Sequence, residues 1–252
     1  YFNKTIMENQ FKNAIELIKQ QDINGCITGS CLLEYFPGAD IDIFVYSESD
    51  LNKLLFYMYY NSMFQILDPL EKYKFEEYIN KGKSSLHKIG LITIKFKYNL
   101  SIDINVVYRK TNHNVFDVVS NFDISLICKG YDIKTGKILD LSDYKGDKVG
   151  TYNKWNKAFY SPDIWDCRRL IRQFLRVIKY TERGYDLTQV TDKYISMVEE
   201  IINLNNIYKS ERGTDFFEKN QKEFKIVLGI LQIWKQEGKM SSENQLILQT
   251  FI

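Results

Sequence analysis

Apolar residues recur at helical spacing near the start of the chain. Residues 2–20 place them three to four positions apart, which predicts an amphipathic helix. A second helix is predicted to begin at Ser47, where Ser-Glu-Ser-Asp precedes apolar residues at the same spacing. A shorter helix is expected over residues 69–79. The tyrosines of the second helix are expected to pack in the core rather than to form a platform for bases: Tyr57, Tyr59 and Tyr60.

Elsewhere in the first half, apolar and polar residues alternate, as in strands with one buried face. This pattern covers residues 40–45, 90–97 and 101–108, and the last two segments are close enough to form a hairpin. Residues 23–28 predict a further short strand that ends at a Gly-Ser pair. The first half is therefore expected to be an α+β domain, with a mixed or antiparallel sheet flanked by helices.

The second half has the pattern of a helical domain. A polar stretch over residues 142–161 separates it from the first half, and we expect domains at residues 1–145 and 146–252. Ser161-Pro162 begins a helical pattern that ends before Gly184, as an N-cap, a first-turn proline and a terminating glycine predict. Two more helical patterns cover residues 188–209 and 215–237.

Composition is that of a folded globular chain. Of 252 residues, 44% are hydrophobic, 26% are charged and only three are prolines, so the chain is not expected to be disordered. The net charge of +2 does not demand a nucleic-acid partner. No apolar run approaches the ~20 residues that span a bilayer, and no signal peptide is evident. We therefore expect a soluble, cytoplasmic protein that does not contact a membrane.

The cysteines do not form a metal-binding pattern. They are widely spaced, they include no Cys-x-x-Cys pair, and the chain has only two histidines. Reduced thiols are expected rather than a zinc site: Cys26, Cys31, Cys128 and Cys167.

Two aspartates form the clearest candidate site. In an extended strand, Asp40 and Asp42 point to the same face, and two adjacent anions favour a cation. Magnesium prefers several oxygen ligands, so a third carboxylate is expected. Asp103 lies in the middle of a β-branched segment that is expected beside the first strand. Three aspartates in this arrangement are expected to hold two metal ions.

A turn upstream of these aspartates suits a phosphate. Gly29 allows close approach of the backbone, and Ser30 offers a hydroxyl and is expected to cap a short helix that begins at Cys31. The free amides at the start of a helix attract anions. The chain thus combines a predicted phosphate site with a predicted metal site.

Gly29-Ser30, nine intervening residues, Asp40-Ile41-Asp42 and the distal Asp103 together resemble the nucleotidyltransferase superfamily of DNA polymerase beta type. The resemblance covers residues 23–108, with a looser similarity to viral members over residues 121–128. It implies a nucleotidyltransferase core that transfers a nucleoside monophosphate from a nucleoside triphosphate to an acceptor hydroxyl. It also implies two Mg²⁺ or Mn²⁺ ions on the three aspartates, β and γ phosphates at Gly29 and Ser30, and a helical half that closes one side of the cleft.

Basic residues form one stripe on the predicted helix that ends before Gly184. At ~100° per residue they share a narrow face, opposite the apolar side chains. The stripe consists of Arg168, Arg172, Arg176, Lys179 and Arg183. One interpretation is that this stripe faces solvent. The other is that it binds the triphosphate or the phosphates of an acceptor, with Arg168, Arg172 and Arg176 as the candidate residues.

Three alternatives share the same motif. A cyclic-oligonucleotide synthase and an RNA-end polymerase would use the same site with a nucleotide or an RNA as acceptor. A catalytically idle module would keep the fold and bind only a nucleotide or a protein. The motif does not specify the acceptor, because an RNA end, a protein, an antibiotic and a second nucleotide all require the same carboxylates.

Overall fold

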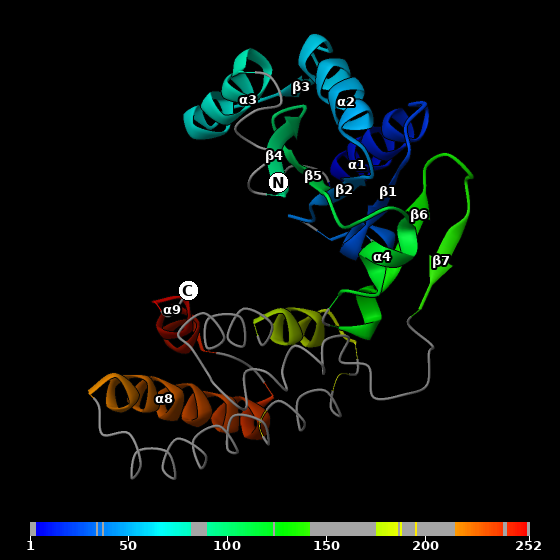
Figure 1. Ribbon diagram of the computed structural model, residues 1–252. Coiled ribbons are helices and arrows are strands. Elements are labelled where there is room, and N and C mark those ends of the chain that lie inside the picture. Colours follow the sequence, from blue (N-terminus) through cyan, green and yellow to red (C-terminus); the bar gives the residue numbers. More distant parts are fainter. Residues whose placement is uncertain are drawn as a thin grey trace. The chain divides into compact units, whose positions relative to one another are not determined.

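The computed structural model divides the chain into two compact units, residues 1–150 and residues 151–252 (Figure 1). The residues that it describes are 4–33, 35–36, 38–81, 90–122, 124–141, 175–185, 187, 195, 215–238 and 241–250. Each unit is described separately below.

The first unit is built on a seven-stranded sheet with the strand order β3-β4-β5-β2-β1-β6-β7. The strands are β1 (Gly25–Thr28), β2 (Ile41–Val45), β3 (Phe64–Gln65), β4 (Leu91–Tyr98), β5 (Ile102–Arg109), β6 (Lys129–Asp132) and β7 (Ile138–Asp140). The β2–β5 pair is parallel and the other pairs are antiparallel. The expected α+β class and mixed sheet are therefore confirmed, as is the hairpin of β4 and β5.

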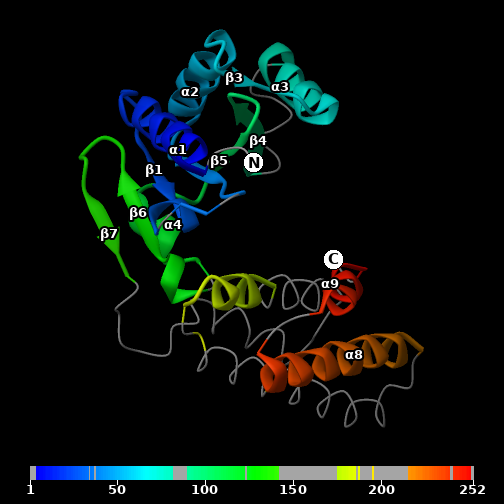
Figure 2. The ribbon, with the colours of Figure 1, turned by 180° about the vertical axis from the view of Figure 1, so that it is seen from behind.

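Helices cover the apolar face of this sheet. They include α1 (Lys4–Lys19), α2 (Glu48–Tyr60) and α3 (Pro69–Lys81), and Figures 1 and 2 show α1 and α2 close together beside the strands. Alternation along the central strands places their aliphatic side chains in one core with these helices. Fully buried members of that core are Ile18, Ile27, Ile41, Ile43, Leu51, Leu54, Ile104 and Val106.

A short helix lies on the opposite face of the sheet. This is α4 (Val115–Val119), which contacts β6 and β1. Gly130 of β6 makes the close approach possible, since a Cβ at this position would lie 2.4 Å from Val115 Cγ2 and 2.9 Å from Val119 Cγ1. The polar face of β2, β5 and β4 beyond α4 carries the predicted site.

The start of α2 confirms the helix start predicted at Ser47. The Asp50 amide donates to Ser47 Oγ at 3.0 Å, and the Ser47 hydroxyl donates back to Asp50 Oδ2 at 2.5 Å. Asn24 also donates to Asp50 Oδ2 at 3.2 Å. Burial by itself would raise the pKa of Asp50, but these hydrogen bonds and the charge of Lys53 outweigh it and lower the pKa.

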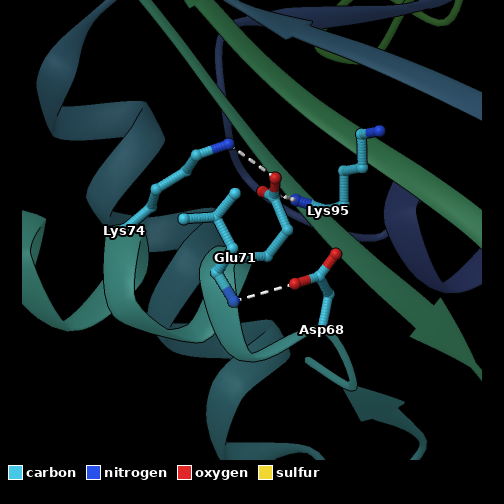
Figure 3. A network of polar contacts seen from close by, with 5 residues as sticks. Asp68, Glu71, Lys74 and Lys95 are labelled. Atoms are coloured by element: carbon cyan, nitrogen blue, oxygen red, sulfur yellow. Dashed lines mark hydrogen bonds and ion pairs between the residues drawn. The ribbon is translucent and has the colours of Figure 1, made fainter.

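Helix α3 protects part of the sheet edge (Figure 3). Strand β3 pairs only with the last two residues of β4, so the amide of Lys95 needs another partner. The buried carboxylate of Glu71 supplies it, because Oε2 accepts from the Lys95 amide at 3.2 Å while Oε1 pairs with Lys74 Nζ at 2.7 Å. Asp68 Oδ1 accepts from the Leu70 amide at 2.8 Å at the start of the same helix.

The expectation that all three tyrosines of α2 pack in the core was wrong. Tyr60 is 77% exposed and Tyr59 is 50% exposed, whereas Tyr57 is half-buried. Tyr59 stacks on Phe75 of α3 with ring centroids 4.8 Å apart, so aromatic packing at the surface replaces burial. Tyr59 and Tyr60 therefore lie at the surface side of the last turn of α2, whereas Met58 of the same turn is fully buried in the core.

The described part of the second unit is helical. It comprises residues 175–182, α8 (Asp215–Glu237) and α9 (Ser242–Thr250). Helix α8 matches the predicted residues 215–237 and buries Val227, Leu231 and Trp234. Gly184, with φ at +93°, follows residues 175–182, as predicted. The predicted helix at residues 188–209 lies outside the described residues apart from residue 195.

Helix α9 was not predicted from the sequence.

Across the described parts of both units, none of the helices combines the length and the apolar character needed to cross a membrane.

Candidate active site

Asp40 and Asp42 converge on one side chain of the neighbouring strand. Asp42 lies in β2 opposite Asn105 of β5, and Asp40 directly precedes the strand. Asn105 Nδ2 donates to Asp42 Oδ1 at 2.8 Å and to Asp40 Oδ2 at 3.3 Å. The two carboxylates therefore share a face, as the alternation predicted, and one amide joins them.

Gly29 brings bare backbone against this pair. Its φ of +85° lies in the left-handed region, and a Cβ at this position would lie 3.1 Å from Asp42 Oδ2. The close approach at Gly29 was predicted for a phosphate, whereas the neighbour in the structure is a carboxylate of the chain itself. Thr28, which precedes Gly29 and pairs with Asp42 across the β1–β2 ladder, is fully buried. Among the described residues, its hydroxyl has no hydrogen-bond partner.

Ser30 does not cap a helix that begins at Cys31. The turn is a 3₁₀ helix, η1 (Gly29–Leu32), and its N-cap is Thr28, which makes no side-chain capping bond. Ser30 is buried inside this turn, and its carbonyl accepts from the Leu33 amide at 3.1 Å. The positive φ of Gly29 starts the turn two residues earlier than the sequence pattern suggested.

Asp103 lies on the same face of β5, two residues before Asn105. It does not contact the Asn105 amide that joins the pair; its Oδ1 forms an ion pair with Lys97 Nζ at 2.7 Å, across the β4–β5 ladder. About 60% of the Asp103 side chain is exposed. The alternation of residues 101–108 places Asn105 on the same strand face as Asp103, and that position is the signal the sequence offers for it.

Cys31 is a buried residue of the same turn, and its thiol is not expected to react as a nucleophile. Its Sγ donates to the Thr28 carbonyl at 2.9 Å. Burial first, and then the negative charge of Asp42, raise the pKa of the Cys31 thiol well above its ordinary value. Cys26, Cys31 and Cys128 are buried thiols that form no disulfide bond, in line with the expected reduced state, and Cys167 lies outside the described residues.

The side chains at this face suit a hard divalent cation. Carboxylate oxygens are among the ligands that Mg²⁺ and Mn²⁺ prefer, and Asp40 and Asp42 supply them at the start of β2, beside Asn105 of β5. Within the described ranges, no group of three or more acidic, histidine or cysteine side chains is close enough to hold a metal. The donor set thus fits a cation that completes its shell with water and phosphate oxygens.

The predicted basic stripe is described only in part. Arg168 and Arg172 lie outside the described residues, whereas Arg176 is exposed on the helical residues 175–182. Val177 and Ile178 of that helix are buried, as predicted for its apolar side.

Comparisons with protein families, with curated proteins and with solved structures find no match to this chain.

Proposed function

We propose that this protein is a metal-dependent nucleotidyltransferase, which transfers a nucleoside monophosphate from a nucleoside triphosphate to an acceptor hydroxyl and releases pyrophosphate. The observation that carries the proposal is the convergence of the Asp40 and Asp42 carboxylates on Asn105, beside the bare backbone of Gly29. The order of the motif, Gly-Ser, then Asp-x-Asp, then a distal aspartate on an adjacent strand, supports it.

Each group at the face has a role in this proposal. Asp40 and Asp42 would hold two Mg²⁺ or Mn²⁺ ions, with Asp103 as the third carboxylate. When bound, these ions neutralise the triphosphate and make the acceptor hydroxyl easier to deprotonate. The turn at Gly29 and Ser30 would receive the β and γ phosphates on its backbone amides.

The chemistry is an in-line displacement. The acceptor hydroxyl would give up its proton to Asp103, and its oxygen would form a bond to the α-phosphorus. The bond from the α-phosphorus to the bridging oxygen of the β-phosphate breaks, and pyrophosphate leaves with that electron pair. In this scheme Lys97 must release Asp103, since the two side chains form an ion pair.

The basic stripe extends the proposal to the second unit. Arg168, Arg172 and Arg176 are the proposed contacts to the triphosphate or to the phosphates of an acceptor such as RNA. Charge removal at these positions is expected to raise the KM for one substrate without disturbing metal binding.

A second candidate is a nucleotide-binding module without catalysis. The ion pair between Lys97 and Asp103 favours it, because that pair occupies one oxygen of the third carboxylate. Nucleotide binding that needs no metal would support this candidate over the transferase.

The experiment incubates the protein with each α-labelled ribonucleoside triphosphate and Mg²⁺ or Mn²⁺, with and without RNA, and separates the products by size. Labelled RNA indicates a terminal transferase, and a small labelled product without RNA indicates a cyclic or dinucleotide synthase. Asp40→Asn and Asp42→Asn are expected to abolish the product while circular dichroism shows an intact fold. Full activity in either variant would refute the assignment.

A further inference from the structure

We propose that Asn105 is a positioning residue that holds the carboxylates of Asp40 and Asp42 ready for a divalent cation, an inference that rests on the proposed function. Its Nδ2 donates to one oxygen of each, at 2.8 Å for Asp42 Oδ1 and 3.3 Å for Asp40 Oδ2. An amide nitrogen has two N–H groups, which is the number of donors that two such bonds require. The second oxygen of each carboxylate is left out of this bridge.

The amide of Asn105 reduces the repulsion between the carboxylates of Asp40 and Asp42. Two carboxylates on one strand face repel each other, and the repulsion grows when their solvation is incomplete. Both side chains are half-buried. The amide nitrogen of Asn105 presents partial positive charge to both anions. It therefore lowers the repulsion between the two carboxylates when no cation is bound.

The sheet holds Asn105 in this position. The parallel β2–β5 ladder sets Asn105 opposite Asp42. Its neighbours Ile104 and Val106 are fully buried on the other face, so the strand cannot slip without exposing them. A site built on central strands keeps its geometry better than one built on loops.

Asn105 and Asp103 differ although they share a face of β5. Asp103 is largely exposed and paired with Lys97, whereas Asn105 contacts both members of the acidic pair. Groups that orient metal ligands in this way typically contribute 10–100-fold to metal affinity. Asn105 thus acts through Asp40 and Asp42.

The test titrates the full chain with Mn²⁺ and follows free Mn²⁺ by electron paramagnetic resonance. Asn105→Ala and the similarly sized Asn105→Leu, which both lack the two donors, are expected to bind Mn²⁺ about tenfold more weakly. The matched control is Asn52→Ala, because Asn52 Oδ1 accepts from Tyr78 Oη at 2.7 Å and takes no part in the bridge between the carboxylates. This control is expected to stay within about twofold of wild type, since it leaves the shell around the metal ligands intact.

Activity gives a second readout. With the Asn105 variants, the Mn²⁺ concentration for half-maximal activity should rise while kcat at saturating Mn²⁺ approaches the wild-type value. If the Asn105 variants acted only by disturbing the structure, kcat would fall at all metal concentrations. Asn52→Ala, which also removes a side-chain hydrogen bond, would then show the same fall. Circular dichroism and urea unfolding check that at least one Asn105 variant is folded.

The outcomes separate the two proposals. If Asp42→Asn abolishes Mn²⁺ binding while both folded Asn105 variants bind as wild type does, the inference about Asn105 is overturned and the proposed function stands. If Asp42→Asn itself binds Mn²⁺ normally, the proposed metal site fails. Weaker binding in both Asn105 variants, with Asn52→Ala unchanged, supports the inference.

Discussion

Replacing Gly29 by alanine tests how closely the turn and the acidic pair fit together. The added methyl group would lie 3.1 Å from Asp42 Oδ2, closer than ordinary van der Waals contact, so the carboxylate must move by a few tenths of an ångström. The backbone must also hold an alanine at φ +85°. The substitution therefore combines backbone strain with displacement of a proposed metal ligand.

The two effects can be given magnitudes. A left-handed conformation costs an alanine about 1–2 kcal/mol, and the lower entropy of the unfolded chain returns about 0.4–1 kcal/mol. The net loss in the free energy of unfolding is thus about 1 kcal/mol. Displacement of Asp42 is expected to weaken Mn²⁺ binding by about tenfold, the lower end for a disturbed ligand shell.

Gly38→Ala is the matched control. Gly38 has a similar φ of +77°, but apart from its chain neighbours no described residue has an atom within 4 Å of the position that an added methyl group would take, so this variant carries the strain without the contact. Urea unfolding should show similar losses of stability for both variants, whereas Mn²⁺ titration should separate them. Equal Mn²⁺ affinity in Gly29→Ala and Gly38→Ala would refute the reasoning.

Two further predictions concern the same unit. Ser47→Ala removes the N-cap of α2 and a donor to Asp50, and should cost about 1 kcal/mol at pH 7. The folded pKa of Asp50 is lowered from 3.8, so this contribution is present above pH 3.8 and is lost as the pH falls through the folded pKa. Urea unfolding at pH 7 and pH 3 should therefore show a smaller cost in acid, and an equal cost would contradict the role of the Asp50 carboxylate. Burial raises the pKa of Cys26 to about 12 and also raises that of Cys31, so iodoacetamide at pH 8 should label both only after unfolding. Detection of either labelled thiol in the native protein by mass spectrometry would contradict this prediction.

Local sequence signals predicted the elements whose ends are set by nearby residues. Ser47 begins α2 through its own hydrogen bonds, and Val227, Leu231 and Trp234 of α8 are buried at the helical spacing that was predicted. The strands of Asp42 and Asp103 were predicted to be neighbours because a magnesium site needs a third carboxylate, and β2 and β5 do pair. These features follow from the periods of helices and strands and from capping chemistry.

Features that depend on the register between strands were not predictable in the same way. The bonds from Asn105 to the aspartates, and the pairing of Lys97 with Asp103, arise only when three strands align. Ser30 was misassigned as a cap because the left-handed Gly29 starts the turn earlier. Tyr59 was misassigned because its packing partner, Phe75, belongs to another helix.

The most direct test of the central claim measures binding of a non-hydrolysable nucleoside triphosphate by calorimetry, with and without Mn²⁺. The wild-type chain should bind the nucleotide only when Mn²⁺ is present, and Asp42→Asn should lose this binding. Asp68→Asn is the control, because Asp68 caps α3 and lies apart from the acidic pair. Equal nucleotide affinity without Mn²⁺, or normal binding by Asp42→Asn, would contradict the claim that these carboxylates form a metal-dependent nucleotide site.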